Sequence, residues 1–479
     1  MKIVFAAAEA APFIKTGGLG DVAEALPGTL SKVKDNEIYL FLPYYNKIKY
    51  NENIKTEFVT SFKVDLSWRK QHCGVFKFKS KRQKLQVFFI DNEYYFNRAN
   101  IYGEEDDGER FAYFSKAILE SVKRLNLNPD IIHCNDWQTA LVPVFLHAFY
   151  HKELGNAKTV FTIHNIEYQG KCDPYFIGDT LGLYPDYEST LMYDNCVNFL
   201  KAAVLKADAV TTVSESYMKE LSYPYYSHGL SAVINEHLFK SCGIVNGINT
   251  EIFNPETDKD IYENYNKASV FKLKVKNKTA LQKELGLEVD ESIPMIGMVS
   301  RLVSHKGLDL IEAKLNELLS KNVQLVILGT GDKKYEEALK KAADKNKGKM
   351  SLNLVFNLKL ASKIYAACDM YLMPSKSEPC GLSQLIAMRY GTIPIVNAVG
   401  GLKDTVIPFN PQTNKGNGFN FQSYNADDML GAVNRALELY YKDKETFNKV
   451  IENAICGDYS WKKSAKKYMD LYCKIANYK

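Results

Sequence analysis

Short runs of Val, Ile, Leu and Phe recur along this chain, and helical patterns separate several of them. The runs lie at residues 2–8, 38–42, 87–90, 131–132, 159–163, 209–213, 295–299, 324–328, 352–355, 370–373 and 392–396. Between two of them, Phe111, Phe114, Ile118 and Val122 follow spacings of three and four residues, which indicates one face of a helix. Strands that alternate with helices form parallel sheets covered by helices. The pattern therefore predicts an α/β protein.

The series of runs is interrupted by an Asn-, Lys- and Glu-rich stretch at residues 245–285, and strand patterns resume at Met295. A chain of 479 residues is long enough for two or three domains. We expect one α/β domain over residues 1–245, a second over residues 246–458, and a final segment, 459–479, that forms a helix.

Composition narrows the class of protein further. Hydrophobic residues make up 46% of the chain and charged residues 24%, which is typical of globular proteins and excludes intrinsic disorder. No run approaches the roughly 18 apolar residues of a membrane span, and Glu9 ends the first run too early for a signal peptide. The net charge of +5 is spread along the chain, so neither nucleic acid nor a membrane is an expected partner. Nine cysteines without a CxxC pair indicate reduced thiols in a cytoplasmic protein.

Polar motifs directly follow many of the strand runs. They are residues 15–20, 133–137, 164–165, 301–306, 329–332 and 375–381, together with Ser214. In open parallel sheets, ligands bind beyond the carboxyl ends of the strands. Because both predicted domains present such an edge, we expect a ligand in a cleft between them.

The first motif, KTGGLGDV at residues 15–22, is a glycine-rich loop. Glycines let backbone N–H groups approach a phosphate, the following helix offers its N-terminus to an anion, and Lys15 adds a charge. A turn that needs glycine only for its own conformation is the alternative. The GxGxxA match at residues 18–23 also raises a nicotinamide dehydrogenase, but the glycines lie far beyond the first strand and no acidic residue ends the second. The chain has no GxxxxGKS/T motif, so a P-loop NTPase is not indicated.

His133, Asp136 and His164 follow two successive strand runs. A metal site is conceivable, but the spacing matches no zinc motif and no cysteine cluster accompanies it. Such side chains also supply the paired donors and acceptors that sugar hydroxyls need. Each histidine taken singly is equally compatible with a half-buried, hydrogen-bonded structural residue.

Two motifs of the second predicted domain carry charge. Arg301 and Lys306 lie at a strand-to-helix junction, where the helix N-terminus adds partial positive charge, and they suit a diphosphate. Glu378 follows another strand run, so its carboxylate can hold a ribose or a sugar while the N–H groups from Gly381 to Ser383 face a phosphate. The alternatives are two surface cations and an acidic helix cap.

Taken in order, these motifs resemble the bacterial glycogen synthase and plant starch synthase family. The resemblance runs nearly from end to end, and no single motif carries it. It rests on residues 15–22 (KTGGLGDV), 133–137, 246–248, 254–258 (NPETD), 300–310, 378–384 (EPCGLSQ), 387–391, 400–406 (GGLKDTV) and 459–461.

The resemblance implies a GT-B fold, in which two Rossmann-like domains face a central cleft and a C-terminal helix crosses back to the N-terminal domain. It implies retaining transfer of glucose from ADP-glucose to the non-reducing 4-hydroxyl of an α-1,4-glucan such as glycogen, with release of ADP. No metal or other cofactor is expected, because cations and helix N-termini stabilise the departing diphosphate. Aromatic residues at 91–98 and Tyr102 could stack on the acceptor or form ordinary core and rim contacts.

The resemblance also implies roles for individual residues. Glu378 would support a cationic transition state without a covalent bond, and Arg301 and Lys306 would stabilise the departing diphosphate. Asp136 and His164 would lie at the glucosyl group. The donor-binding residues implied in the same way are Lys15, Gly17, Gly18, Asn246, Phe356, Cys380, Gly381, Leu382 and Ser383.

Two other functions stay open at this point. One is a related retaining transferase with another donor or acceptor, such as a sucrose-type synthase. The other is a catalytically silent glucan- or nucleotide-binding protein. A binder need not keep Lys15, His164, Arg301, Lys306 and Glu378 together, so their joint presence argues against it.

Overall fold

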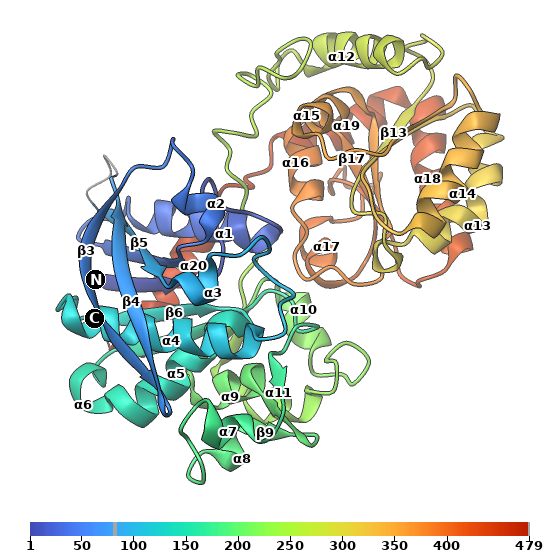
Figure 1. Cartoon of the computed structure of the whole chain (residues 1–479). Helices are drawn as coiled ribbons and strands as arrows, with labels where there is room; N and C mark the ends of the chain where they lie inside the picture. The colour runs from blue at the N-terminus through green and yellow to red at the C-terminus, as the bar shows by residue number, and fades with distance from the viewer. Residues whose placement is uncertain (80–83, 478–479) are drawn as a thin grey trace. The chain divides into compact units, whose positions relative to one another are not determined.

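A computed structural model describes residues 1–79 and 84–477, which form two compact units (Figure 1). The N-terminal unit comprises Met1–Asn246 and the C-terminal segment from Trp461, and the C-terminal unit comprises Gly247–Ser460. Each unit is built on a largely parallel sheet with helices, as the alternating runs predict. Within the described ranges, no helix is long and apolar enough to cross a membrane.

The main sheet of the N-terminal unit has the strand order β12-β11-β7-β6-β1-β2-β5-β4-β3. Its strands are β1 (Lys2–Ala6), β2 (Glu37–Pro43), β3 (Thr56–Leu66), β4 (Arg69–Phe78), β5 (Leu85–Asp91), β6 (Ile131–Asn135), β7 (Lys158–Ile163), β11 (Ala209–Thr212) and β12 (Ser241–Gly243). A small second sheet joins β8 (Lys171–Cys172), β10 (Cys196–Asn198) and β9 (Met192–Tyr193). The helices of this unit are α1 (Gly18–Leu30), α2 (Asn46–Lys49), α3 (Glu93–Phe96), α4 (Asp107–Arg124), α5 (Leu141–Phe145), α6 (His151–Leu154), α7 (Phe176–Asp179), α8 (Glu188–Leu191), α9 (Phe199–Lys206), α10 (Glu215–Glu220), α11 (Ser231–Glu236) and α20 (Trp461–Ile475).

The strand order of this sheet reverses at β1. β1 pairs in parallel with β2 on one side and with β6 on the other, and the chain reaches β2 first, through α1. Ile3, Val4 and Phe5 are fully buried, so β1 lies in the centre of the core. Loops that follow the strands at such a reversal form the usual ligand site of an open α/β sheet.

The antiparallel hairpin β3–β4 at the edge of the sheet is absent from the predicted strands. Exposed and more buried residues mix along β3, and Phe58 is 60% exposed. An edge hairpin that faces water on one side needs no continuous apolar run, so such runs do not predict it.

The C-terminal helix α20 belongs to the N-terminal unit, where it packs against α1. The Ser464 hydroxyl donates a hydrogen bond to the carbonyl oxygen of Val245, and the Tyr472 hydroxyl lies 2.5 Å from His133 Nδ1 on β6. The chain therefore returns to its first unit at its end, as the resemblance implies.

The sheet of the C-terminal unit is parallel throughout, with the order β15-β14-β13-β16-β17-β18. Its strands are β13 (Met295–Val299), β14 (Gln324–Leu328), β15 (Met350–Asn353), β16 (Met370–Met373), β17 (Ile393–Asn397) and β18 (Phe419–Phe421). Its helices are α12 (Val270–Glu284), α13 (Leu308–Leu319), α14 (Lys333–Lys345), α15 (Leu358–Ala367), α16 (Ser383–Arg389), α17 (Gly400–Thr405), α18 (Ala426–Lys442) and α19 (Lys444–Ile455). Figure 1 shows α13, α14 and α18 on one side of this sheet and α15, α16 and α19 on the other. The strand order reverses at β13, between β14 and β16.

Candidate functional site

The glycine-rich loop of the N-terminal unit follows β1, at the reversal of the sheet. Gly17 has an extended backbone with φ of −153°, and a side chain there would meet only Glu9 Oε1, at 3.9 Å from its Cβ. A Cβ on Gly18 would meet nothing within 4 Å. A larger residue at position 17 or 18 would therefore meet neither a strained backbone conformation nor a clash with neighbouring atoms of the protein. The space in front of them is open to a molecule that approaches the backbone closely.

Lys15, in the same loop, forms an ion pair with Asp21. Its Nζ lies 2.7 Å from Asp21 Oδ1, and the two side chains are 43% and 34% exposed. An ion pair with this exposure contributes about 0–1 kcal/mol, so an anionic ligand can compete with Asp21 for the lysine.

Asp136, which follows β6, combines backbone strain with a perturbed carboxylate. Its φ of 56° and ψ of 179° border a region that is nearly confined to glycine, and such a conformation costs about 1–3 kcal/mol. Its Oδ1 accepts hydrogen bonds from the N–H groups of His164, at 2.7 Å, and Asn165, at 3.4 Å. Burial nevertheless raises the pKa of Asp136 to about 7. Strain and a shifted pKa at the end of a strand are typical of a functional residue.

His164, which follows β7, is neutral near pH 7 because burial lowers its pKa to about 3. Its Nε2 lies 2.9 Å from Asn135 Oδ1. The Asn135 amide nitrogen donates to the carbonyl oxygen of Ala6, so its Oδ1 faces the histidine as an acceptor. The Nε2 of His164 therefore carries the proton, and Nδ1 is left as an acceptor.

His133, by contrast, is a core residue. It is fully buried, with Nδ1 2.5 Å from the Tyr472 hydroxyl and Nε2 2.6 Å from the Thr162 hydroxyl. Both ring nitrogens are occupied within the protein, so His133 joins the sheet to α20. Among the two predicted histidines, the structure leaves only His164 with an available ring nitrogen.

Asn246, the last residue of the N-terminal unit before α20, is 6% exposed. Its Oδ1 is buried and accepts no hydrogen bond within the described part of the chain. Tyr102 is only partly exposed and its ring lies 6.1 Å from that of Phe111, which favours the core and rim contacts considered above.

In the C-terminal unit, Lys306 and Glu378 form one pair. Lys306 ends a short turn, Ser304–Lys306, that follows β13, and Glu378 follows the neighbouring strand β16. Lys306 Nζ donates to Glu378 Oε2 at 2.6 Å, and the Ser375 hydroxyl donates to the same oxygen at 3.1 Å. The side chains of Lys306 and Glu378 are 18% and 11% exposed, so the pair is mostly buried but still reaches solvent. Ser375 lies in the polar motif at residues 375–381 but is not among the predicted site residues.

The backbone around Glu378 is held by two glycines at the start of α17. Gly400 has φ of 45°, and a Cβ there would lie 2.2 Å from the carbonyl oxygen of Glu378. The Gly401 N–H donates to that oxygen at 3.0 Å, and a Cβ on Gly401 would lie 2.1 Å from the carbonyl oxygen of Cys380. Close backbone approach fixes the loop that carries Glu378.

The remaining predicted residues of this unit differ in exposure. Arg301 is exposed and forms no ion pair in the described part of the chain. Phe356, beyond the end of β15, is 82% exposed. Cys380 is 5% exposed, Gly381 has φ of 73°, and Leu382 and Ser383 are half-buried at the start of α16. The exposed cation and ring are free to contact a ligand, whereas Cys380 can offer mainly its backbone.

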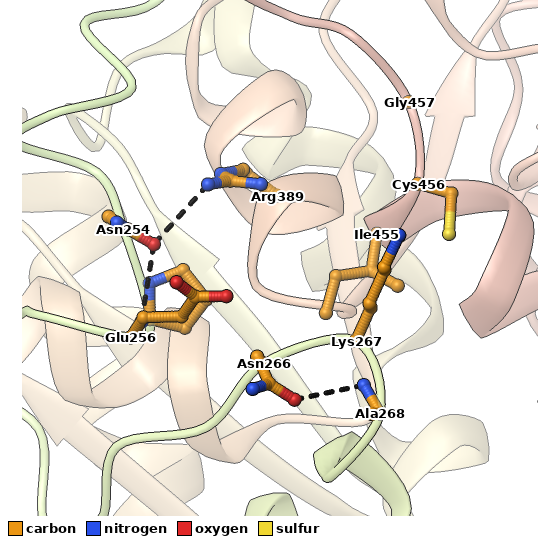
Figure 2. A pocket seen from close by; sticks show the side chains of 10 residues that line it. Asn254, Glu256, Asn266, Lys267, Ala268, Arg389, Ile455, Cys456 and Gly457 are labelled. Carbon is orange, nitrogen blue, oxygen red and sulfur yellow. Dashed lines mark hydrogen bonds between the residues drawn. The ribbon is translucent and has the colours of Figure 1, made fainter.

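A separate hollow of about 380 Å³ lies in the C-terminal unit at the far end of α16 (Figure 2). Arg389 lines it, and its guanidinium donates to Asn254 Oδ1 at 3.3 Å. Glu256, Lys267 and Cys456 also line it, and no predicted site residue does. Over residues 1–79 and 84–477, no group of three or more His, Cys, Asp or Glu side chains could hold a metal ion.

Two family models match the chain in succession. The starch synthase catalytic domain matches residues 2–236, and the glycosyl transferases group 1 family matches residues 277–466. A sucrose-phosphate synthase from Thermosynechococcus elongatus superposes with a TM-score of 0.61 at 16% identity, with full coverage of both chains, which shows a common fold. The fold and the matched domains define a glycosyltransferase of the GT-B class.

Closer relatives place the chain within this class. It is 48% identical to a glycogen synthase of Clostridium acetobutylicum, over 99% of this chain and 100% of the relative. It is 44% identical to a glycogen synthase of Streptococcus agalactiae with the same coverage. The catalytic domain of starch synthase IV from Arabidopsis thaliana, solved with ADP and acarbose, matches with a TM-score of 0.90, 34% identity and 99% coverage of both chains. The chain belongs to the glycogen synthase and starch synthase family.

Proposed function

We propose that this glycosyltransferase transfers glucose from ADP-glucose to the non-reducing 4-hydroxyl of an α-1,4-glucan, with retention of configuration and release of ADP. The observation that carries the proposal is the Lys306–Glu378 pair at the reversal of the C-terminal sheet. It places a cation that suits a diphosphate 2.6 Å from a carboxylate that suits a sugar. The names of the relatives support the acceptor, and the ADP held by the starch synthase IV domain supports the donor.

In this proposal the C-terminal unit holds the nucleotide. Phe356 would stack on adenine, and Arg301 and Lys306 would take the diphosphate. Fixed cations stabilise negative charge that develops on a departing group, which is often the largest contribution to catalysis. The N–H groups of residues 381–383 would complete the phosphate contacts, so the transfer needs no metal.

The N-terminal unit would supply groups to the glucosyl residue. The Nδ1 of His164 accepts a hydrogen bond from a sugar hydroxyl, and Asp136 offers its carboxylate nearby. Asn246 has an Oδ1 acceptor to offer, and Lys15 and the amides at Gly17 and Gly18 would contact the donor.

The chemistry proposed here breaks the bond between glucose C1 and the β-phosphate oxygen of ADP, and the electron pair leaves with ADP. The acceptor O4 bonds to C1 on the same face of the sugar, which preserves the configuration. The departing phosphate oxygen is then the nearest base for the O4 proton. Glu378 would stabilise positive charge on the sugar without forming a covalent bond.

The test is transfer of labelled glucose to a glycogen primer, with ADP-glucose and UDP-glucose in parallel and with a chelator present. We expect α-1,4-linked product mainly from ADP-glucose, at a rate that the chelator does not change. Comparable incorporation from UDP-glucose would refute the assignment of ADP-glucose as the preferred donor. No incorporation by a folded protein that binds ADP would refute the assignment of the glucan as acceptor, or favour a catalytically silent binding protein.

A further inference from the structure

Glu9, just beyond the end of β1, lies inside the curve of the glycine-rich loop. It is 2% exposed. Its Oε2 accepts hydrogen bonds from the Thr16 N–H and the Thr16 hydroxyl, both at 2.7 Å, and its Oε1 accepts one from the Gly20 N–H at 3.2 Å. Burial raises the pKa of Glu9, although these donors pull it down. A carboxylate is therefore kept in the core by contacts with this one loop.

The contacts of Glu9 replace a missing helix cap. Helix α1 begins at Gly18, and its N-cap residue, Gly17, has no side chain with which to accept from the first turn. In most helices, a Ser, Thr, Asp or Asn at that position accepts from the second or third helical N–H. Gly20 is the third helical residue here, and its N–H donates to Glu9 instead. Glu9 caps α1 from eleven residues upstream.

This arrangement leaves two amides of the first helical turn without an acceptor in the described part of the chain. The amides of Gly18 and Leu19 donate to no backbone or side-chain acceptor among residues 1–79 and 84–477. A residue with its own capping side chain would fit at Gly17, because only Glu9 Oε1 comes within 4 Å of its Cβ. The chain instead has a glycine as the N-cap residue, and Glu9 accepts the hydrogen bond from Gly20. No N-cap side chain therefore lies beside the free amides of Gly18 and Leu19.

We propose that Glu9 is a positioning residue for the transfer reaction: it caps α1 from inside the loop and thereby holds the free amides of Gly18 and Leu19 toward the donor. This inference rests on the proposed function, because the loop is assigned to the donor there. It adds a residue that the family motif at 15–22 does not include. The signal in the sequence is an acidic residue at a strand end, followed by a helix whose N-cap is glycine.

The first test separates capping from the reaction. We expect Glu9→Ala to speed hydrogen exchange at Gly20 at least about tenfold and to leave the last turn of α1 unchanged, because only the Gly20 N–H loses its acceptor. In the double variant Glu9→Ala/Gly17→Ser, the serine hydroxyl can accept from Gly20, so slow exchange should return in part. Unchanged exchange in Glu9→Ala would overturn the capping role.

The second test asks whether Glu9 positions the loop for the reaction. It compares kcat/KM among the variants at a temperature where every variant is folded. We expect kcat/KM for ADP-glucose to fall about 30- to 100-fold in Glu9→Ala, since small misplacements of binding groups have effects of this size. Glu9→Gln should lie in between, because it keeps one acceptor oxygen but brings an NH₂ group against Thr16. A purely structural role would lower the unfolding midpoint and leave kcat/KM unchanged.

The matched control is Asn198→Ala. Asn198 is fully buried in the same unit and caps α9 by accepting from the Lys201 N–H at 2.9 Å. Its loss should lower the midpoint and leave kcat/KM within about threefold. An equal fall of kcat/KM in both variants, or no fall in Glu9→Ala, would overturn the positioning role.

A failure of the proposed function would look different. If the unsubstituted chain transfers no glucose, the function is wrong, and the role of Glu9 is then read from exchange and from the Kd of ADP-glucose measured by calorimetry. An unchanged Kd in Glu9→Ala would then refute the inference as well.

Discussion

Replacing Asp136 by asparagine tests whether the carboxyl group at the end of β6 lowers the stability of the folded protein. Burial raises its pKa from 3.8 to about 7. In the unfolded chain the carboxyl ionises near 3.8, so between these values the folded protein holds a proton that the unfolded chain has lost. The stability contributed by this group is therefore fully present below pH 3.8 and is lost as the pH rises toward 7.

The size of the effect follows from the two pKa values. At about 1.4 kcal/mol per pKa unit, the raised pKa lowers the free energy of unfolding by about 2 kcal/mol at pH 5 and by about 4 kcal/mol at pH 8, relative to its value below pH 3.8. Asparagine avoids this cost and keeps Oδ1 as the acceptor for the His164 N–H. Its NH₂ group lacks a placed acceptor, which costs about 1.5 kcal/mol. We expect Asp136→Asn to match the unsubstituted chain at pH 5 and to be about 3 kcal/mol more stable at pH 8.

Urea unfolding of the full chain at pH 5 and pH 8 measures the difference, and glucose transfer should be lost in the same variant. The control is Asp208→Asn. Asp208 accepts hydrogen bonds from the Thr159 N–H and hydroxyl, at 2.8 and 2.9 Å, and its carboxylate lies 3.4 Å from Lys158 Nζ. The asparagine loses this ion pair, so the free energy of unfolding should not rise at either pH. A stability gain in Asp136→Asn that is equal at both pH values, or absent at pH 8, would refute the reasoning.

Three further substitutions test single features. Glu378→Gln removes the charge that faces Lys306, and we expect kcat to fall at least about 100-fold with the circular dichroism spectrum unchanged; a smaller fall contradicts its proposed role. Phe356→Ala should raise the KM for ADP-glucose about 5- to 10-fold, as expected for one lost ring stack, and leave the unfolding midpoint in place; an unchanged KM excludes stacking. Tyr472→Phe leaves His133 Nδ1 without its partner and should lower the free energy of unfolding by about 1–2 kcal/mol, while transfer by the folded protein continues; loss of transfer would show that this contact is more than structural.

The central strands were predictable from the sequence because both of their faces are buried. β1, β6 and β7 are buried along nearly their whole length and appear in the sequence as runs of apolar residues. β15 begins and ends two residues before its predicted run, because Leu354 and Val355 beyond it are partly exposed apolar residues of the following loop.

Helix α12 shows where the sequence misleads. It lies in the Asn- and Lys-rich stretch that interrupts the predicted strands, and its lysines suggest a solvated segment. Lys274 is nevertheless 7% exposed, and its Nζ donates to the Thr392 hydroxyl at 2.6 Å and the Ala366 carbonyl oxygen at 2.9 Å. A lysine side chain can be buried when acceptors from distant parts of the sequence surround its ammonium group. The composition of a segment contains no information about those acceptors.

The sequence by itself determined the α/β class, the order of the motifs and their places at strand ends, because apolar periodicity and local motifs are properties of neighbouring residues. Only the tertiary structure decided which of these residues act together. Parallel pairing of β13 with β16 brings Lys306 to Glu378 across 72 positions. The folded surroundings set the pKa of Asp136, occupied both nitrogens of His133, and turned Glu9 into the cap of a helix that lacks its own. Each of these depends on distances and burial that long-range contacts create, and such contacts are not written in any local stretch of the chain.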